Sequence, residues 1–510
     1  MPAKILVFGV DAMEPKLIHD WIESGDLPNL ARLRARGAWG HVLNPPRFFS
    51  GASWPNFYTG VSPARHGQYL RTLYDPTTCV HRPLRPACQT NPFWSGPDWQ
   101  RKRAAILNVP YCGLDETING LHVADWGQHD SQNDLSTLPH EVAEDLLSRF
   151  GCDPVGDCEG FECTTSALSD LRQRLIRRVQ RKRDMTSHYL AGEDWDLFLS
   201  VFDETHCAGH RFWHLYDVTN SRHDPDAAAT LGGTIKEIYV AIDRALGATL
   251  RFVDIDSTVL FLSSHGMGPA FDALPVFDEI LRRLDGFTGR HPQYEERRAR
   301  RLATARAISD FMPNVLRRGL APVRQRFGRG HLRDRVDAER RNRRYFWLPT
   351  HDTCGGIRIN LAGRETTGMV QPGRQCAELI EQLTYDLHQL RDGRSGDPIV
   401  AEIVSSADMD FTGYVGEFPD LIVRWSKASL SWIESPKIGR IEPVVVSGRS
   451  GDHDPSMRGI FFAAGPHVTP GLLPDPVRLE DFAPTISSLL GIQLPDTEGR
   501  AIPAVGPPAH

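Results

Sequence analysis

The sequence has no long apolar run and little imbalance of charge. No stretch approaches the roughly 20 consecutive apolar residues that a membrane-spanning helix requires, so we expect no membrane partner. The 510 residues carry a formal net charge of −6, and nothing in the overall composition indicates binding to nucleic acid. Internal repeats and low-complexity tails are also absent from the sequence. The chain therefore has the composition of an ordinary globular protein, with enough length for a large core.

The beginning of the sequence lacks the features of a secretory signal. Residues 1–11 hold one lysine and a short apolar run, without a small-residue cleavage site. The nine cysteines are odd in number and scattered, and the densest group lacks the spacing of zinc-knuckle pairs. A disulfide framework is therefore not expected. We interpret the thiols as reduced and the protein as cytoplasmic.

Apolar runs that end in polar side chains recur along the sequence. Residues 4–10 suit a strand buried on both faces, and Asp11 follows this strand directly. Because ligands gather beyond the carboxyl ends of the strands in open α/β sheets, a polar residue at such an end is well placed for chemistry. Three further runs have this form. They are residues 197–202 before Asp203, Glu204 and His206, residues 258–262 before Ser264 and His265, and residues 444–446 ahead of His453.

Helical patterns lie between these strands. Strands that alternate with helices predict an α/β fold with a doubly wound, mainly parallel sheet flanked by helices. We expect one main domain over residues 1–510 with two inserted segments. The helical stretches are residues 15–36, 138–150, 168–190, 227–252 and 376–390.

The two predicted insertions differ in composition. Residues 70–135 are rich in proline, cysteine and tryptophan without a clear period, whereas residues 286–345 carry a dense series of arginines. The arginine series favours a solvated helical face. Its alternative interpretation is a helical cap that attracts an anionic substrate.

A serine close to a proline provides a candidate nucleophile. Ser53 stands two residues before Pro55, and a proline is favoured in the first turn of a helix. A hydroxyl near a helix start benefits from the helix dipole and from unpaired backbone N–H groups, which stabilise an oxyanion. Ser50 is the competing candidate in the same segment.

With this segment, the sequence resembles the type I phosphodiesterase and nucleotide pyrophosphatase family of the alkaline phosphatase superfamily. Each motif is weak alone, but together they follow the family's order across most of the chain. The resemblance implies an alkaline-phosphatase-like fold and a metal-dependent hydrolase of small-molecule phosphate esters. The motifs are the first strand with Asp11, Leu27-Pro28-Asn29-Leu30, Ser53-x-Pro55 with Thr59-Gly60, Pro63 and His66-Gly67, His265-Gly266-Met267, and Gly451-Asp452-His453 before Gly459.

The resemblance also implies one or two divalent metal ions, usually zinc. It assigns Asp11, Ser53 and His265 to the first metal and His453 to the second. Ser53 would be the catalytic nucleophile, which attacks phosphorus and forms a phosphoserine that a metal-activated water then hydrolyses.

Two positions depart from the family pattern. Ser264 replaces an aspartate before His265, and His206 replaces an aspartate four residues before His210. Histidines at this spacing share one face of a helix, so both imidazoles could reach one metal. Asp203, Glu204 and Ser264 are further candidates for metal ligands or for groups that orient an imidazole. An imidazole-rich site favours zinc over manganese or iron, and the loss of two carboxylates predicts weaker metal binding.

Other residues are candidates for substrate binding. Asn108 and Arg358 could each reach a phosphoryl oxygen, as could Asn360. A structural role in a strand is the alternative for the latter two residues. The sulfatase pattern Cys-x-Pro-x-Arg is absent, and Phe57 stands where its arginine would be, so sulfate ester hydrolysis is disfavoured.

Two alternatives to a phosphodiesterase-like hydrolase stay open. The first is a phosphomonoesterase, or a phosphoryl or phosphono transferase, because the choice of leaving group depends on the inserted segments, which we expect to form a lid. The second is a non-catalytic metal- or anion-binding protein, because Ser264 and His206 replace carboxylates. For His41, His66 and His214 a packed or hydrogen-bonded role is favoured. The sequence predicts no oligomeric state.

Overall fold

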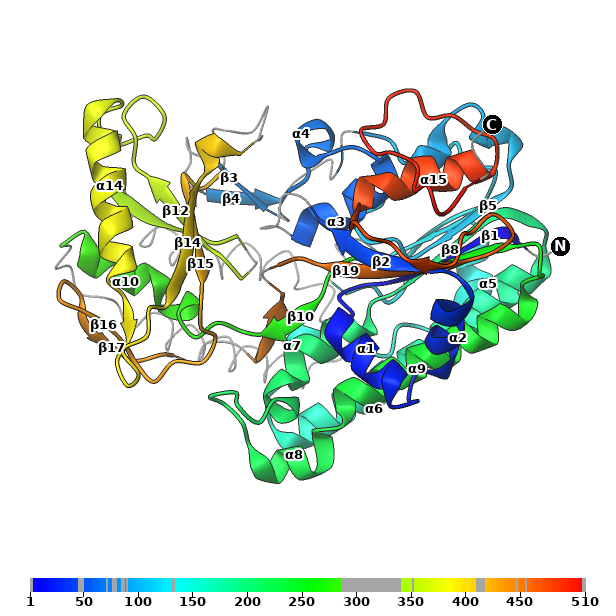
Figure 1. The fold of residues 1–510 in the computed structure, drawn as a ribbon, viewed down its shortest axis with the longest axis horizontal. Helices are drawn as coiled ribbons and strands as arrows, with labels where there is room; N and C mark the ends of the chain where they lie inside the picture. The colour runs from blue at the N-terminus through cyan, green and yellow to red at the C-terminus, as the bar shows by residue number, and fades with distance from the viewer. Residues whose placement is uncertain are drawn as a thin grey trace.

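A computed structural model describes the chain over most of its length, in two parts that each have their own sheet (Figure 1). Among the described residues, no helix has both the length and the apolarity needed to cross a bilayer. The described residues are 3–44, 50–69, 72–75, 80–83, 88, 90–129, 134–286, 341–350, 353–409, 418–444, 448–454 and 456–506.

The larger part contains a ten-stranded sheet in the order β20, β2, β19, β9, β1, β8, β5, β6 and β7, with β21 beside β2. Its centre is parallel, because β1 runs parallel to both of its neighbours. Only β7 and β19 run against their neighbours, so the predicted fold class is confirmed. The strands are β1 (Ala3–Val10), β2 (Ala38–Leu43), β5 (Ala104–Leu107), β6 (Gly120–Ala124), β7 (Ser136–Leu138), β8 (Trp195–Phe202), β9 (Thr258–Ser263), β19 (Gly459–Ala464), β20 (Gly471–Leu472) and β21 (Val477–Arg478).

Helices cover both faces of this sheet because its central strands are apolar on both sides. Phe8 of β1 packs into a core with residues of α1, α2, α6, α7 and α9. Val7, the neighbouring residue, packs into a second core with α3 and α15. The helices are α1 (Pro15–Glu23), α2 (Pro28–Arg36), α3 (Ser53–Thr59), α4 (Pro63–His66), α5 (Val142–Phe150), α6 (Thr165–Gly192), α7 (Glu204–Tyr216), α8 (Pro225–Leu231), α9 (Thr234–Thr249) and α15 (Phe482–Leu489).

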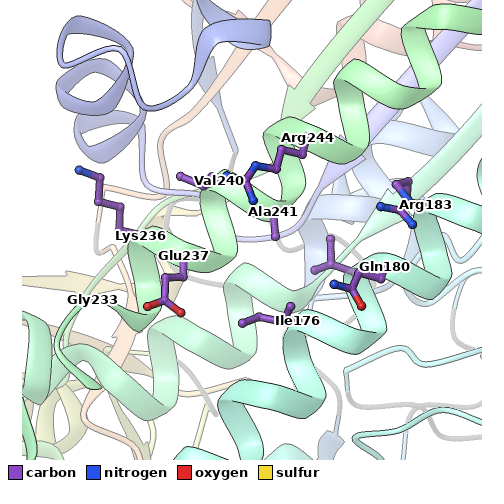
Figure 2. A pocket seen from close by; sticks show the side chains of 10 residues that line it. Ile176, Gln180, Arg183, Gly233, Lys236, Glu237, Val240, Ala241 and Arg244 are labelled. Carbon is purple, nitrogen blue, oxygen red and sulfur yellow. The ribbon is translucent and has the colours of Figure 1, made fainter. Parts of the chain in front are cut away.

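Two of the predicted helical stretches are each divided in two. The stretch 15–36 breaks between α1 and α2, because Gly25 has a left-handed φ of 82° and Pro28 starts a new helix. The stretch 227–252 breaks at two glycines between α8 and α9. Helices α6 and α9 pack together, and a groove of about 530 Å³ between them is lined by side chains of both (Figure 2).

The smaller part has a four-stranded antiparallel sheet in the order β11, β12, β15 and β14, drawn in yellow and orange in Figure 1. It has its own apolar core, to which α10 and α14 contribute. A three-stranded sheet of β13, β16 and β17 adjoins it. The elements are α10 (Phe277–Leu284), β11 (Tyr345–Leu348), β12 (Gly355–Ile359), α14 (Arg374–His388), β13 (Arg391–Asp392), β14 (Val400–Ser405), β15 (Leu421–Trp425), β16 (Ile433–Ser435) and β17 (Gly439–Ile441).

The two predicted insertions relate differently to this fold. Most of the arginine-rich segment lies outside the described residues, which omit 287–340, and so do residues 445–446 of the strand predicted at 444–446. Within the range 70–135, by contrast, β5 and β6 are members of the central sheet. These strands have only four and five residues, which is too short for a sequence period to identify them.

Short elements complete the described chain. A hairpin of β3 (Thr72–Asp75) and β4 (Val80–Pro83) and the pair β10 (Met267–Pro269) and β18 (Gly451–His453) are separate two-stranded sheets. The 3-10 turns are η1 (Ser50–Ala52), η2 (Phe93–Ser95), η3 (Trp99–Arg101), η4 (Cys158–Gly160), η5 (Leu250–Phe252), η6 (Leu274–Val276), η7 (Ser406–Asp408) and η8 (Leu479–Asp481).

Candidate active site

The carboxyl ends of three parallel strands define the position of the site. Val10, the last residue of β1, is paired with Phe202 of β8 and with Ser263 of β9. The residues that follow these strands, among them Asp11 and Ser264, therefore lie at one edge of the sheet. This edge is where an α/β sheet binds its ligands.

Helix α7, strand β18 and the segment after β9 bring four histidines to this edge. His206 and His210 share one face of α7, which begins directly after β8. His453 of β18 lies opposite Met267 of β10, two residues beyond His265. The ring centroids of His206 and His210 are 4.4 Å apart, and those of His265 and His453 are 4.7 Å apart. We call these four buried residues the histidine cluster.

Ring nitrogens approach each other closely within the histidine cluster. Nε2 of His206 lies 2.8 Å from Nε2 of His453 and 3.3 Å from Nε2 of His210. A tetrahedral zinc with Zn–N bonds of about 2.0–2.1 Å holds its nitrogen ligands about 3.3 Å apart. Burial lowers the pKa of His206, His210 and His265 well below the ordinary value, and neighbouring imidazoles add to this effect. The cluster therefore favours neutral imidazoles, the state in which histidine binds a metal.

Asp11 connects to the histidine cluster through a serine. The hydroxyl of Ser264 donates a hydrogen bond of 2.9 Å to Oδ1 of Asp11, and it lies 3.0 Å from Nδ1 of His265. With its proton directed to Asp11, the serine accepts from Nδ1 of His265, which leaves the lone pair of this imidazole on Nε2. That Nε2 atom is buried without a hydrogen-bond partner among the described residues. Ser264 thus orients His265 at a position where the family pattern has a carboxylate ligand.

The carboxyl group of Asp11 is itself constrained. Trp54, the residue after the predicted nucleophile, donates an indole hydrogen bond of 2.9 Å to Oδ1 of Asp11. Burial raises the pKa of Asp11, while this hydrogen bond opposes the shift. A cation bound beside Asp11 would favour its ionised form.

His210 is held in a defined tautomer. Its Nδ1 donates 2.8 Å to the carbonyl of Gly451, so the lone pair is on Nε2. Arg449 donates to that Nε2 atom across 2.9 Å. A metal bound through Nε2 of His210 would therefore take the place of the guanidinium of Arg449.

Asp452 is a further carboxylate at the histidine cluster. Its Oδ1 lies 4.0 Å from Nδ1 of His210 and 4.0 Å from Nδ1 of His453. Ligand atoms of these three residues lie within 4.8 Å of one another, as do those of His206, His265 and His453. Sequence reasoning did not propose Asp452 as a ligand, although it stands in the Gly451-Asp452-His453 motif.

Two glycines permit the close packing around these histidines. A Cβ on Gly266 would overlap the carboxylate of Glu14, which accepts from the backbone N–H of Met267. A Cβ on Gly451 would overlap the carbonyl of Gly209 on α7. Packing therefore requires the glycine two residues before His453, whereas a Cβ at Gly266 would displace the end of the Glu14 side chain.

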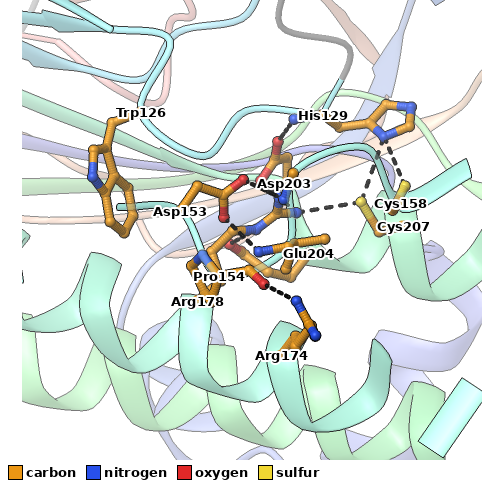
Figure 3. Close-up of polar contacts among 12 residues, drawn as sticks. Trp126, His129, Asp153, Pro154, Cys158, Arg174, Arg178, Asp203, Glu204 and Cys207 are labelled. Atoms are coloured by element: carbon orange, nitrogen blue, oxygen red, sulfur yellow. Dashed lines mark hydrogen bonds and ion pairs between the residues drawn. The ribbon is translucent and has the colours of Figure 1, made fainter. Parts of the chain in front are cut away.

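Asp203 and Glu204 lie against the cationic side chains of α6, among them Arg178 (Figure 3). Oδ1 of Asp203 lies 2.5 Å from Nζ of Lys182, and Oε1 of Glu204 lies 2.9 Å from Nε of Arg178. Burial opposes the charge of Asp203, but Arg178 and Lys182 outweigh it and lower its pKa to about 2. Both carboxylates, predicted as possible ligands or orienting groups, therefore bind cations of α6.

Ser53 is the first residue of α3 and is fully buried. Its Oγ accepts a hydrogen bond from the side-chain amide of Asn44. The side-chain amide of Asn56 donates a hydrogen bond of 3.2 Å to Oδ1 of Asn44. Nε2 of His66 in turn lies 2.7 Å from the side-chain oxygen, Oδ1, of Asn56. Because the backbone N–H of Gln68 donates to Nδ1 of His66, that imidazole donates through Nε2.

This chain of hydrogen bonds runs toward the serine and leaves the hydroxyl proton of Ser53 available as a donor. Burial lowers the pKa of His66 to about 3, so its imidazole is neutral. Sequence reasoning missed Asn44, although it follows β2 as Asp11 follows β1. Strand β2 is antiparallel to β19, and β19 is antiparallel to β9, so β2 ends at the same edge as β9.

The predicted substrate-binding residues lie in two different places. Asn108 follows β5 at the edge of the central sheet, and its Oδ1 accepts from the backbone N–H of Trp126. Arg358 lies in β12 of the smaller sheet, with Nη2 2.6 Å from the carboxylate of Glu365. Asn360 donates to backbone carbonyls next to the same sheet. Arg358 and Asn360 thus make the contacts expected of their structural alternative.

A mainly parallel α/β sheet, with a buried serine and a histidine cluster beyond its strand ends, places the chain in the alkaline-phosphatase-like class. The sequence profile of the type I phosphodiesterase / nucleotide pyrophosphatase family matches residues 5–408, and the chain belongs to this family. The resemblance predicted from the motifs is thereby confirmed.

One curated relative is an uncharacterized pyrophosphatase/phosphodiesterase of Schizosaccharomyces pombe. It is 23% identical over 261 residues, which are 50% of this chain and 43% of the yeast protein. The chain thus aligns with less than half of that relative. His453 lies beyond the end of the family match.

Proposed function

We propose that the chain is a metal-dependent phosphodiesterase that acts through a phosphoserine at Ser53. The observation that carries this proposal is the close approach of buried ring nitrogens, 2.8 and 3.3 Å between Nε2 atoms, in the histidine cluster. The 3.3 Å spacing of neutral imidazoles matches nitrogen ligands on a tetrahedral zinc, and the 2.8 Å spacing is about 0.5 Å shorter. The family of phosphodiesterases and nucleotide pyrophosphatases supplies the reaction class.

In this proposal the ligands divide between two ions. Asp11, Ser53 and His265 would hold one ion. His206, His210 and His453 would hold the other, with Asp452 beside them. We favour zinc because imidazole nitrogen is its common ligand, and manganese or iron is the alternative. Few carboxylates balance the ions, so we expect weaker binding than in an aspartate-rich site.

The protein's own side chains would supply the nucleophile of the reaction and position it. The oxygen of Ser53 forms a bond to phosphorus as the bond from phosphorus to the leaving oxygen breaks. Water later cleaves the phosphoserine and releases the phosphoryl group together with the second ester group of the diester. Bound divalent cations would lower the pKa of the attacking hydroxyl and water and offset charge on the phosphoryl oxygens. Asn44 orients the serine oxygen through its donated hydrogen bond. Ser264 holds the tautomer of His265.

Replacing the nucleophile tests this proposal. We expect Ser53→Ala to reduce hydrolysis of bis-p-nitrophenyl phosphate by about 10³-fold or more. Ser50→Ala is the matched control, because Ser50 is the nearby competing serine, and this variant should keep its activity. Full activity in Ser53→Ala, or loss of activity only in Ser50→Ala, would contradict the assignment. Acid quenching during turnover of this diester should trap a p-nitrophenyl phosphoryl group on the peptide that contains Ser53.

A monoesterase is the second candidate, and Arg449 favours it. The guanidinium of Arg449 lies at the histidine cluster, 23% of its side chain is exposed, and arginine binds phosphate in a bidentate manner. A phosphate monoester carries one more ionisable oxygen than a diester. A higher kcat/KM for p-nitrophenyl phosphate than for the diester, lost in Arg449→Ala, would select the monoesterase. No hydrolysis of either ester and no bound metal would instead favour a non-catalytic protein.

A further inference from the structure

Two thiols and one imidazole converge at a point behind the histidine cluster. Nδ1 of His129 lies 3.1 Å from Sγ of Cys158 and 3.4 Å from Sγ of Cys207 (Figure 3). The ligand atoms of all three residues lie within 4.8 Å of one another, and both cysteines are buried. The residues come from three separate segments, namely the loop after β6, the turn η4 and helix α7.

We propose that His129, Cys158 and Cys207 hold a zinc ion that is distinct from the metals of the phosphoester site. Thiolate and imidazole are the typical zinc ligands, and thiolates disfavour magnesium, calcium and manganese. Around a tetrahedral zinc, with bonds of about 2.3 Å to sulfur and about 2.0 Å to nitrogen, a sulfur and a nitrogen lie about 3.5 Å apart. The two observed distances are close to this spacing.

Groups around the three ligands hold them in place. Arg178 donates to Sγ of Cys207 across 3.3 Å. The backbone N–H of His129 donates to the carboxylate of Asp203, which Lys182 binds from its other side. Hydrogen bonds of this kind orient the ligands of metal sites and tune their basicity.

The charges of the surroundings suit a zinc bound by two thiolates. Such a unit is neutral, because two thiolates balance one divalent cation. The adjacent buried groups are already balanced, since Arg178 and Lys182 face Asp203 and Glu204. Zinc at this site therefore adds no net charge to a region where an uncompensated charge would be costly.

The position of the site suggests that it is structural and supports the histidine cluster. Cys207 follows His206 on α7, and the rings of His129 and His206 have centroids 4.0 Å apart. Zinc at the three ligands would join the loop after β6, η4 and the first turn of α7. The first turn of α7, which carries His206, would then be held by the zinc through Cys207.

Cobalt substitution of the full-length protein tests the proposal. Cobalt bound by thiolates gives a near-ultraviolet charge-transfer band, which a site of histidine and aspartate alone does not give. We expect this band in the wild-type protein and its loss in Cys158→Ser and in Cys207→Ser. Cys112→Ser, at a buried thiol elsewhere, and Cys152→Ser, at an exposed thiol, should keep the band. A wild-type protein that takes up cobalt without this band would overturn the proposal.

Zinc analysis provides a second measurement that does not depend on activity. Elemental analysis should show one equivalent of zinc less in Cys207→Ser than in Cys112→Ser. Equal zinc contents would overturn the proposal, as would a disulfide between Cys158 and Cys207 found by peptide mapping of the protein as purified. The outcome is separable from the proposed function. If a protein without esterase activity shows the charge-transfer band, the proposed zinc site stands and only the proposed phosphodiesterase activity is contradicted.

Discussion

The two faces of helix α7 carry buried groups of opposite kinds. One face presents His206 and His210, with lowered pKa values, to the edge of the central sheet. The other presents Glu204 and Cys207 to the cations of α6. The position of an acidic residue after a strand does not by itself predict a metal ligand. Cationic side chains of a neighbouring helix can bind its carboxylate instead. The site face is left poor in carboxylates, so the metal of the proposed function would be held mainly by neutral imidazoles.

The largest effect should come from breaking the site face alone. We expect His265→Ala to lower kcat/KM for the diester by about 10³-fold or more, because the metal ligand of the proposed function and its orienting contact with Ser264 are both lost. His41→Ala, at an exposed histidine, is the matched control and should retain activity. Steady-state kinetics checks both variants. Equal activities of the two variants would mean that the histidine cluster does not take part in hydrolysis.

Breaking the opposite face should reduce stability. Arg178→Met leaves Asp203 and Glu204 buried with less compensating charge, and we expect the free energy of unfolding to fall by about 3–5 kcal/mol. Urea denaturation measures this change. Arg183→Met is the control on the same helix, because the ion pair of Arg183 is exposed and worth at most about 1 kcal/mol. Similar losses in both variants would show that the buried network has no special weight.

The two faces of α7 should also differ in how pH changes the stability of the metal-free protein. Histidines whose folded pKa is lowered from 6.5 stay neutral while the unfolded chain binds protons, so stability falls as pH drops below 6.5. Each contributes a loss of up to about 1.4 kcal/mol per pH unit. Asp203 behaves differently, because its lowered pKa of about 2 keeps its contribution intact above 3.8.

Unfolding measured after metal removal between pH 7.5 and 5.5 tests this difference. The slope should become smaller in His210→Gln and should stay unchanged in Asp203→Asn. A slope that changes only in Asp203→Asn would reverse the assignment of charge to the two faces.

Much of this arrangement could be predicted from the sequence, and the rest depends on tertiary contacts. The apolar run before Asp11 and the run before Ser264 identify adjacent buried strands, so their position at one edge follows from fold class. The direction of Asp203 could not be predicted, because it depends on two side chains of α6 that are distant in sequence. Asn44 was missed because β2 alternates in burial and has no continuous apolar run.

The smallest expected effect concerns Asn44, whose side-chain amide donates a hydrogen bond to Oγ of Ser53. Removing its hydrogen bond in Asn44→Ala should cost about 0.5–1.5 kcal/mol, or about 2- to 10-fold in kcat. KM should change little, since the lost contact orients the attacking oxygen and not the substrate. Asn56→Ala, one step further along the same chain, should have a weaker effect of the same sign. An increase in KM with unchanged kcat would instead make Asn44 a substrate-binding residue, and the serine would then be oriented by the helix start alone.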